Sequence, residues 1–170
     1  MIQIKEASRS DYALIQQIAH QTWPHTFRHI LSEAQIAYML EMMYSISSIT
    51  EQIEQKGYTF LIARNEEKNL GFAAYELNYE DQPKTKLHKI YILPEAQGLG
   101  LGKLLINYIT EIAKQNQNKV ISLNVNRHNA AFHFYQKIGF KKVAEEKISI
   151  GQGFFMDDFV MDMNLSSSSC

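Results

Sequence analysis

A glycine-rich stretch, QGLGLGK at residues 97–103, is the first feature of the sequence that could do chemistry. Gly98, Gly100 and Gly102 alternate with other residues, and Lys103 follows them. Glycine costs conformational entropy on folding, and its missing side chain lets another group approach the backbone closely. A glycine loop at a helix start also presents free N–H groups and the positive end of the helix dipole. The stretch therefore predicts a site for a phosphate or pyrophosphate, and the alternative is a turn that only packs tightly against its helix.

Two common nucleotide-binding motifs do not fit this stretch. The dinucleotide fingerprint needs G-x-G-x-x-G, whereas the spacing here is G-x-G-x-G. The Walker A loop needs a glycine where Gln97 stands and a hydroxyl residue where Leu104 stands. What remains is a glycine loop between a strand and a helix.

The elements that must position this loop follow from hydrophobic periodicity and turn residues. We expect strands at 58–63, 70–77, 86–93 and 119–125, a helix at 102–116, and a short helix closed by Gly139. Residues 11–56 are predicted to be helical with a break around WPHTFRH, and two strands joined near GQG are predicted to end the chain. This order indicates one α/β domain with a mixed sheet.

Composition sets broad limits. The 170 residues are 45% hydrophobic and 21% charged, with a net charge of -1, which gives no general attraction for nucleic acid or an anionic membrane. We see neither a signal peptide nor a membrane span, and the single cysteine, Cys170, cannot form an internal disulfide. We therefore expect a cytoplasmic protein with a domain at 1–165 and a disordered tail at 166–170.

Two segments resemble signatures of the GNAT N-acetyltransferases. YILPEAQGLGLGKLL resembles the acyl-CoA-binding motif Q/R-x-x-G-x-G/A, with Gln97, Gly100 and Gly102 at its defining positions. NVNRHNAAFHFYQKIGF, residues 124–140, resembles the second signature, N-x-A-x-x-F-Y-x-K-x-G-F. The resemblance extends over the whole chain, and residues 21–45 are loosely similar to a PaiA-like polyamine acetyltransferase subgroup.

The resemblance implies a mixed, mostly antiparallel central sheet flanked by helices, with splayed central strands. The glycine loop would cradle the pyrophosphate of acetyl-CoA, and a strand with a bulge would pair with the pantetheine arm through its exposed backbone. A free N–H in that strand would polarise the thioester carbonyl. The residues expected to bind the cosubstrate are Ile90, Tyr91, Ile92, Gln97, Gly98, Leu99, Gly100, Leu101, Gly102, Lys103, Asn129 and Lys137.

Single residues carry further expectations. Tyr135 matches the family's general acid, which protonates the leaving thiolate, although its helical spacing also suits a core position. Asn129 either bonds the cosubstrate or caps the short helix, and Asn126 is a weaker candidate of the same kind. Lys137 either reaches a phosphate or is solvated.

The base that deprotonates the amine is left open. KLHKIYI contains no acid, so the candidates are His88, Glu76, Glu80 or water. Strict alternation places His88 on the opposite sheet face from Tyr91.

Two clusters in the N-terminal half suggest other chemistry. His25 and His29 have i, i+4 spacing, but no third ligand is evident, so we expect no metal. Residues 29–55 contain four glutamates and no lysine or arginine, which indicates either solvated helix faces or an acidic rim that attracts a cationic amine.

The sequence therefore predicts acetyl transfer from acetyl-CoA to a primary amine by direct attack in a ternary complex. The acceptor is a small molecule, such as a polyamine, or a protein or peptide amine, and a homodimer is a possible assembly. The alternative is a non-catalytic acyl-CoA-binding regulatory module.

Overall fold

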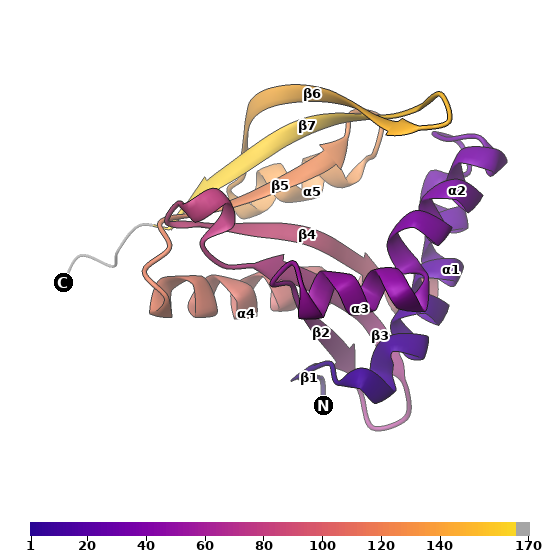
Figure 1. The fold of residues 1–170 in the computed structure, drawn as a ribbon. Helices are drawn as coiled ribbons and strands as arrows, with labels where there is room; N and C mark the ends of the chain where they lie inside the picture. Colours follow the sequence, from indigo (N-terminus) through magenta and orange to yellow (C-terminus); the bar gives the residue numbers. More distant parts are fainter. Residues whose placement is uncertain (166–170) are drawn as a thin grey trace.

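Seven strands form one sheet in the order β1-β2-β3-β4-β5-β7-β6 in the computed structural model, which describes residues 1–165 (Figure 1). The strands are β1 (Gln3–Glu6), β2 (Thr59–Arg64), β3 (Asn69–Glu76), β4 (Lys84–Ile92), β5 (Val120–Asn126), β6 (Lys141–Gly151) and β7 (Phe154–Asn164). The helices are α1 (Tyr12–Phe27), α2 (Glu33–Tyr44), α3 (Ile46–Glu54), α4 (Leu101–Gln115) and α5 (Ala131–Ile138). Short 3-10 turns lie at Arg9–Asp11, Tyr79–Asp81 and Pro94–Ala96. The strands expected at 58–63, 70–77, 86–93 and 119–125 and the helix expected at 102–116 are present within one or two residues of their predicted ends. The predicted tail at 166–170 lies outside the described residues.

The break in the N-terminal helices lies later than predicted. Helix α1 runs through Pro24 to Phe27, and the chain turns at residues 28–32 instead. A proline inside a helix removes its own N–H from the helix ladder and crowds the carbonyl four residues earlier, so a helix that continues through it needs compensating contacts. Trp23 and Phe27, which are buried on either side of it, hold the helix against the sheet.

The two central strands separate halfway along their length. β4 and β5 are the parallel pair, and their register runs only from Lys84–Val120 to Leu87–Leu123. On its other side β4 stays paired with β3 as far as Ile92. The register shift there leaves one extra residue, His88, between Leu87 and Lys89, which is a β-bulge. The splayed central strands and the bulge expected from the family resemblance are therefore confirmed.

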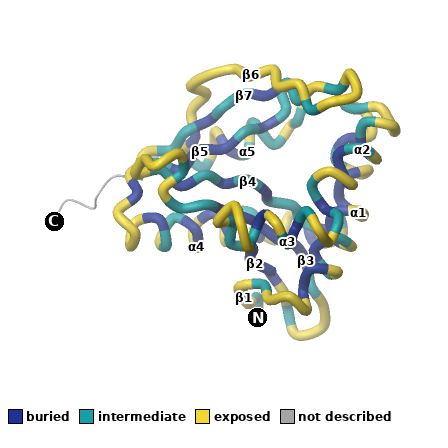
Figure 2. Tube along the Cα trace, viewed as in Figure 1, coloured by how far each residue is buried: buried dark blue, intermediate teal, exposed yellow. Residues whose placement is uncertain are grey.

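Hydrophobic side chains cover both faces of the sheet. One cluster joins α1, α2 and α3 to the sheet and contains Trp23, Tyr44 and Phe72. The other joins α4 and α5 to the opposite face and contains Leu105 and Phe140. Figure 2 shows the buried trace concentrated in the inner strands and helix faces, whereas β6 is exposed along its length.

Gly71 on β3 sets how closely β3 and β4 approach beside the gap. A Cβ added at this position would lie 2.6 Å from the Tyr91 carbonyl oxygen and 2.7 Å from Ile92 Cδ1. We expect Gly71→Ala to lower the free energy of unfolding by ~1–3 kcal/mol, the usual cost of overpacking, because a backbone atom must move. Urea unfolding measures the change. A loss within about 0.5 kcal/mol, the range of neutral surface substitutions, would contradict it.

Candidate active site

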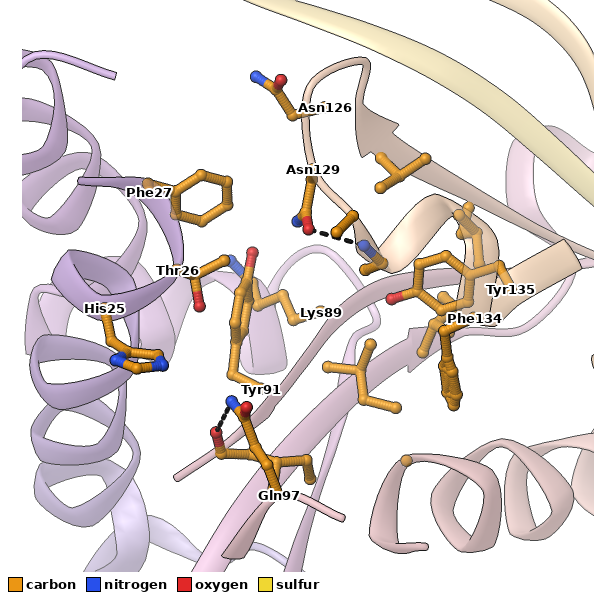
Figure 3. A pocket seen from close by; sticks show the side chains of 18 of the residues that line it. His25, Thr26, Phe27, Lys89, Tyr91, Gln97, Asn126, Asn129, Phe134 and Tyr135 are labelled. Atoms are coloured by element: carbon orange, nitrogen blue, oxygen red, sulfur yellow. Dashed lines mark hydrogen bonds between the residues drawn. The ribbon is translucent and has the colours of Figure 1, made fainter. Parts of the chain in front are cut away.

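The gap between β4 and β5 opens into a cleft of ≈ 850 Å³. Its walls are the end of α1, the second half of β4, the glycine loop, the end of β5 and the start of α5. Figure 3 shows His25, Thr26 and Phe27 on one side, Phe134 and Tyr135 on the other, and Tyr91 and Gln97 between them. This volume is within the range of ligand pockets.

The glycine loop has two kinds of glycine. Gly98 and Gly100 have φ of 85° and 78°, a left-handed conformation that favours glycine, and a Cβ on either would meet nothing within 4 Å. Gly102 differs, because its Cβ would lie 3.1 Å from the Phe134 ring. The tight-packing interpretation therefore holds for Gly102, while Gly98 and Gly100 shape an open turn.

Six consecutive backbone N–H groups of this loop, residues 98–103, are left without a partner. No backbone carbonyl or side chain among residues 1–165 accepts a hydrogen bond from them, whereas the Leu104 N–H already donates to the Gly100 carbonyl at 3.0 Å. They lie at the N-terminus of the fifteen-residue helix α4, where the helix dipole adds partial positive charge. The arrangement suits a phosphate group.

Strand β4 presents a backbone edge to the same cleft. The Leu93 N–H donates to the Leu70 carbonyl at 2.9 Å. Because antiparallel ladders alternate, the N–H groups of Ile92 and Ile90 point away from β3 and toward the gap. The Ile92 carbonyl accepts from Gln97 Nε2 at 3.4 Å. An extended ligand could therefore pair with this edge as an added strand.

Tyr135 reaches the cleft from α5. Its side chain is 8% exposed, and its hydroxyl has no hydrogen-bond partner among the described residues. Figure 3 shows the hydroxyl pointing into the cleft. Burial raises the pKa of this phenol, which keeps it protonated and able to donate.

The remaining predicted residues have separate positions. Asn129 lines the cleft, but its Oδ1 accepts from the Ala131 N–H at 2.9 Å, which fixes the turn that leads into α5. Asn126 lines the cleft and accepts from the His128 N–H in the same way. Leu99 and Lys137 are exposed and do not line it. The residues of the predicted set that do line it are Ile90, Tyr91, Ile92, Gln97, Gly98, Gly100, Leu101, Gly102, Lys103 and Asn129.

A smaller cavity of ≈ 100 Å³ adjoins the cleft between α1, α2, β4, β5 and β7. The two cavities share Phe27, His88, Lys89 and Tyr91 among their lining residues. Most of the wall of the smaller cavity is aromatic or aliphatic, and the buried charged residues in this wall are Lys89 and Asp158. The wall residues unique to it are Trp23, Leu31, Gln35, Met39, Met43, Tyr44, Phe155, Met156 and Asp158.

The bulge overturns the expected placement of His88. His88 and Tyr91 both line the small cavity, so they lie on the same sheet face, because the extra residue breaks the alternation. His88 stacks on Tyr58 at 3.9 Å between ring centroids, and its Nε2 lies 2.9 Å from Glu76 Oε1. Burial, followed by the charges of Lys86 and Lys89, lowers the pKa of His88 to about 3. Glu76 and Glu80 line neither cavity.

Lys89 was missed by sequence reasoning. It lies directly after the bulge, is 7% exposed, and places its Nζ 4.4 Å from the centroid of the Tyr44 ring. Burial, with a smaller contribution from Lys56, lowers its pKa to about 7. The available signal was a lysine directly before the apolar run IYIL, in a strand of a sheet expected to be flanked by helices.

The two other clusters do not form sites of their own. Glu33, Glu41, Glu51 and Glu54 are exposed and line neither cavity, which favours the solvated-face interpretation. His25 and His29 both line the cleft. Among residues 1–165 no three metal-ligating side chains gather as they would around an ion.

No helix among these residues is long and apolar enough to cross a membrane.

The cleft suits the transfer of an acyl group from a phosphate-bearing carrier to a nucleophile. Residues 28–156 match the family described as "Acetyltransferase (GNAT) domain", and the chain therefore belongs to the GNAT acetyltransferases.

Individual relatives agree with this assignment. The chain is 28% identical to spermidine N(1)-acetyltransferase of Thermoplasma acidophilum, over 82% of this chain and 88% of that protein. It is 29% identical to 5-NmdU N-acetyltransferase of Pseudomonas phage PaMx11, over 82% of this chain and 98% of that protein. The crystal structure of PaiA N-acetyltransferase from Thermoplasma acidophilum in complex with coenzyme A superposes with a TM-score of 0.80 at 25% identity, covering 96% of this chain and 99% of that one. The protein is an amine acetyltransferase, and a non-catalytic module is not favoured.

Gly100 provides a direct test of the loop. Asparagine tolerates the left-handed conformation better than most residues, so Gly100→Asn should fold while its side chain occupies space that a ligand phosphate needs. We expect the affinity for coenzyme A to fall at least about tenfold, or ~1.4 kcal/mol, by titration calorimetry.

Gly57 is the matched control for this variant. It has φ of 77°, an added Cβ there would meet nothing within 4 Å, and it lies outside both cavities. Gly57→Asn should therefore carry the same backbone strain without changing affinity. Equal affinities in the two variants would remove the loop from the binding site.

Proposed function

We propose that this protein transfers the acetyl group of acetyl-CoA to the primary amine of a small molecule, by direct attack in a ternary complex. The observation that carries the proposal is that six N–H groups, a strand edge and a tyrosine hydroxyl, all without a partner among residues 1–165, face one cleft. The coenzyme A complex of the PaiA structure supports the choice of carrier.

The carrier would be held by backbone groups. The N–H groups of residues 98–103 would bind the pyrophosphate, with Lys103 adding charge at the rim. The pantetheine arm would pair with β4 at Ile90 and Ile92, where β5 has moved away. An N–H of this edge would then donate to the thioester carbonyl and stabilise the developing oxyanion.

The leaving sulfur would take its proton from Tyr135. A thiolate leaves more readily when a positioned acid protonates it, and such a donor contributes about 10²- to 10⁴-fold. The hydroxyl of Tyr135 meets the structural requirement, because it is protonated, unpartnered and directed into the cleft.

The small cavity would receive the acceptor amine. It adjoins the cleft at Tyr91 and Lys89 and contains the buried carboxyl of Asp158, which accepts from Asn124 Nδ2 at 3.3 Å. Burial raises the pKa of Asp158. A carboxyl group in an otherwise largely apolar pocket suits an aliphatic chain with a second cationic group, whose charge would favour the ionised form of Asp158. The spermidine acetyltransferase relative supports a polyamine as this acceptor.

His88 is a poor candidate for the base. A pKa lowered to about 3 means that its ring nitrogen holds a proton weakly, and a good base has a pKa near the working pH. Its Nε2 is also engaged with Glu76. The acceptor proton must therefore go elsewhere.

An amine panel tests the proposed function. Release of coenzyme A from acetyl-CoA is followed with spermidine, simple monoamines, amino acids and short peptides. Turnover is expected with small amines that fit an apolar pocket. Tight coenzyme A binding with no turnover on any amine would instead favour the binding module.

Tyr135→Phe should separate catalysis from packing. The substitution keeps the ring and removes a hydroxyl that has no partner in the described part of the chain, so stability and coenzyme A affinity should stay near wild type. Single-turnover acetyl transfer should slow about 10²- to 10⁴-fold.

Tyr75→Phe is the matched control. Tyr75 is 6% exposed on β3 and lines neither cavity, so the same change there should leave the transfer rate unaltered. A normal single-turnover rate for Tyr135→Phe would rule out the acid role.

A further inference from the structure

We infer that Lys89 is the general base that accepts the proton of the acceptor ammonium. The inference rests on the proposed function. It assigns a role to a residue that neither the glycine motif nor the second signature contains.

The position of Lys89 brings it to the meeting point of the two cavities. It follows the bulge residue His88 and precedes Ile90, whose N–H points into the gap. Lys89 lines both the cleft and the small cavity. An amine bound in the small cavity and a thioester on β4 would therefore both lie next to this side chain.

The amino group of Lys89 has no partner that would occupy it. Its side chain is 7% exposed, and no hydrogen bond or ion pair joins its Nζ to another residue of the described chain. Its neighbour is the face of the Tyr44 ring at 4.4 Å. Lys86 on the same strand differs, because its Nζ donates to Asn124 Oδ1 at 2.5 Å and it lines neither cavity.

The surroundings of Lys89 favour its neutral form. Burial disfavours the ammonium, and the charge of Lys56 adds to this, so the pKa of Lys89 falls to about 7. A base with this pKa is divided between its two forms at neutral pH and can both take and release a proton. The titratable groups around it are Tyr44 of α2, Lys56 after α3, His88 and Tyr91 of β4, and Asp158 of β7.

The proton balance of the reaction is complete with these groups. Neutral Lys89 takes one proton from the acceptor ammonium. The free amine then forms a C–N bond to the thioester carbonyl carbon, and the C–S bond breaks. The leaving sulfur takes the proton of Tyr135, and the Tyr135 oxygen takes the second proton from the new amide nitrogen. Lys89 finally releases its proton to solvent, so both residues are regenerated.

The kinetic test compares Lys89→Met and Lys89→Arg with Lys86→Met as the matched control. The substrate is an amine that is active in the panel. As the pH is increased, wild-type kcat/KM should rise until about pH 7 and then stay level up to the pKa of the acceptor. Both Lys89 variants should lose 10²- to 10⁴-fold at pH 7. Their kcat/KM should rise about tenfold per pH unit up to the acceptor pKa, because only the free amine reacts. Lys86→Met should keep the wild-type profile.

A second readout needs no acceptor. The unfolded chain binds a proton on Lys89 up to a pKa of about 10.4, whereas the folded protein releases it near 7. The unfolded state therefore binds more protons in this range, and wild-type stability should rise between about pH 7 and pH 10 relative to Lys89→Met. Should Lys89→Met not fold, NMR of ε-¹³C-lysine in the wild type should show one resonance that titrates near pH 7 and is missing in Lys89→Arg.

The outcomes are distinct. An active Lys89→Arg with the wild-type profile would show that Lys89 acts through its charge and would overturn the inference. An unchanged profile in Lys89→Met, or an ordinary lysine titration above pH 10, would also overturn it. No turnover of any amine by the wild type, together with a lysine that titrates near 7, would instead place the failure in the proposed function.

Discussion

Parallel pairing between β4 and β5 stops after Leu87 and Leu123, and the site depends on this interruption. Backbone N–H and C=O groups require partners, and a buried group without one costs ~1–3 kcal/mol. Beyond this point one edge of β4 faces a cleft instead of a strand. β3 continues to pair with its other edge as far as Ile92, so the strand stays in place while its free edge remains available. A ligand that pairs with this edge therefore completes the sheet locally.

Packing on the two faces holds the strands apart. On one face Tyr91 lies among aromatic rings, 5.6 Å from Trp23 and 5.9 Å from Phe72 between centroids, which ties the end of β4 to α1 and β3. On the other face Phe134 of α5 lies against Gly102 of α4, so the glycine loop is held beside the second signature. The glycine loop is therefore tied to both layers, because Leu101 belongs to the same hydrophobic cluster against which Tyr91 packs. Aromatic contacts of this kind have specific geometry as well as large buried area.

Three basic residues of β4 have different surroundings, and these surroundings give each residue a different chemical role. Lys86, His88 and Lys89 lie within four positions, and all three have a lowered pKa because burial disfavours a positive charge. Their partners within the described residues differ: Lys86 donates to Asn124, His88 is paired with Glu76, and Lys89 lies against the Tyr44 ring without a hydrogen bond. The bulge produces this difference, because it turns two consecutive side chains toward the α1 face. On this one strand, Lys86 therefore makes a structural hydrogen bond, His88 is a neutral ring, and Lys89 has an amino group that can exchange a proton.

The sequence by itself determined the order of elements, the glycine loop and the family, because these depend on local periodicity, turn residues and motif spacing. It placed Gln97, Gly98, Gly100 and Tyr135 in one site, and the cleft contains all four. Only the tertiary structure showed that the Phe134 ring leaves little room for a side chain at Gly102. It also showed that Pro24 lies inside α1. Leu99 and Lys137, which the motifs had included, lie outside the cleft. The tertiary structure also decided the environment of Lys89. The bulge and the burial of this lysine without an ion pair among residues 1–165 arise from contacts between segments far apart in the chain. A local pattern of residues does not encode such contacts.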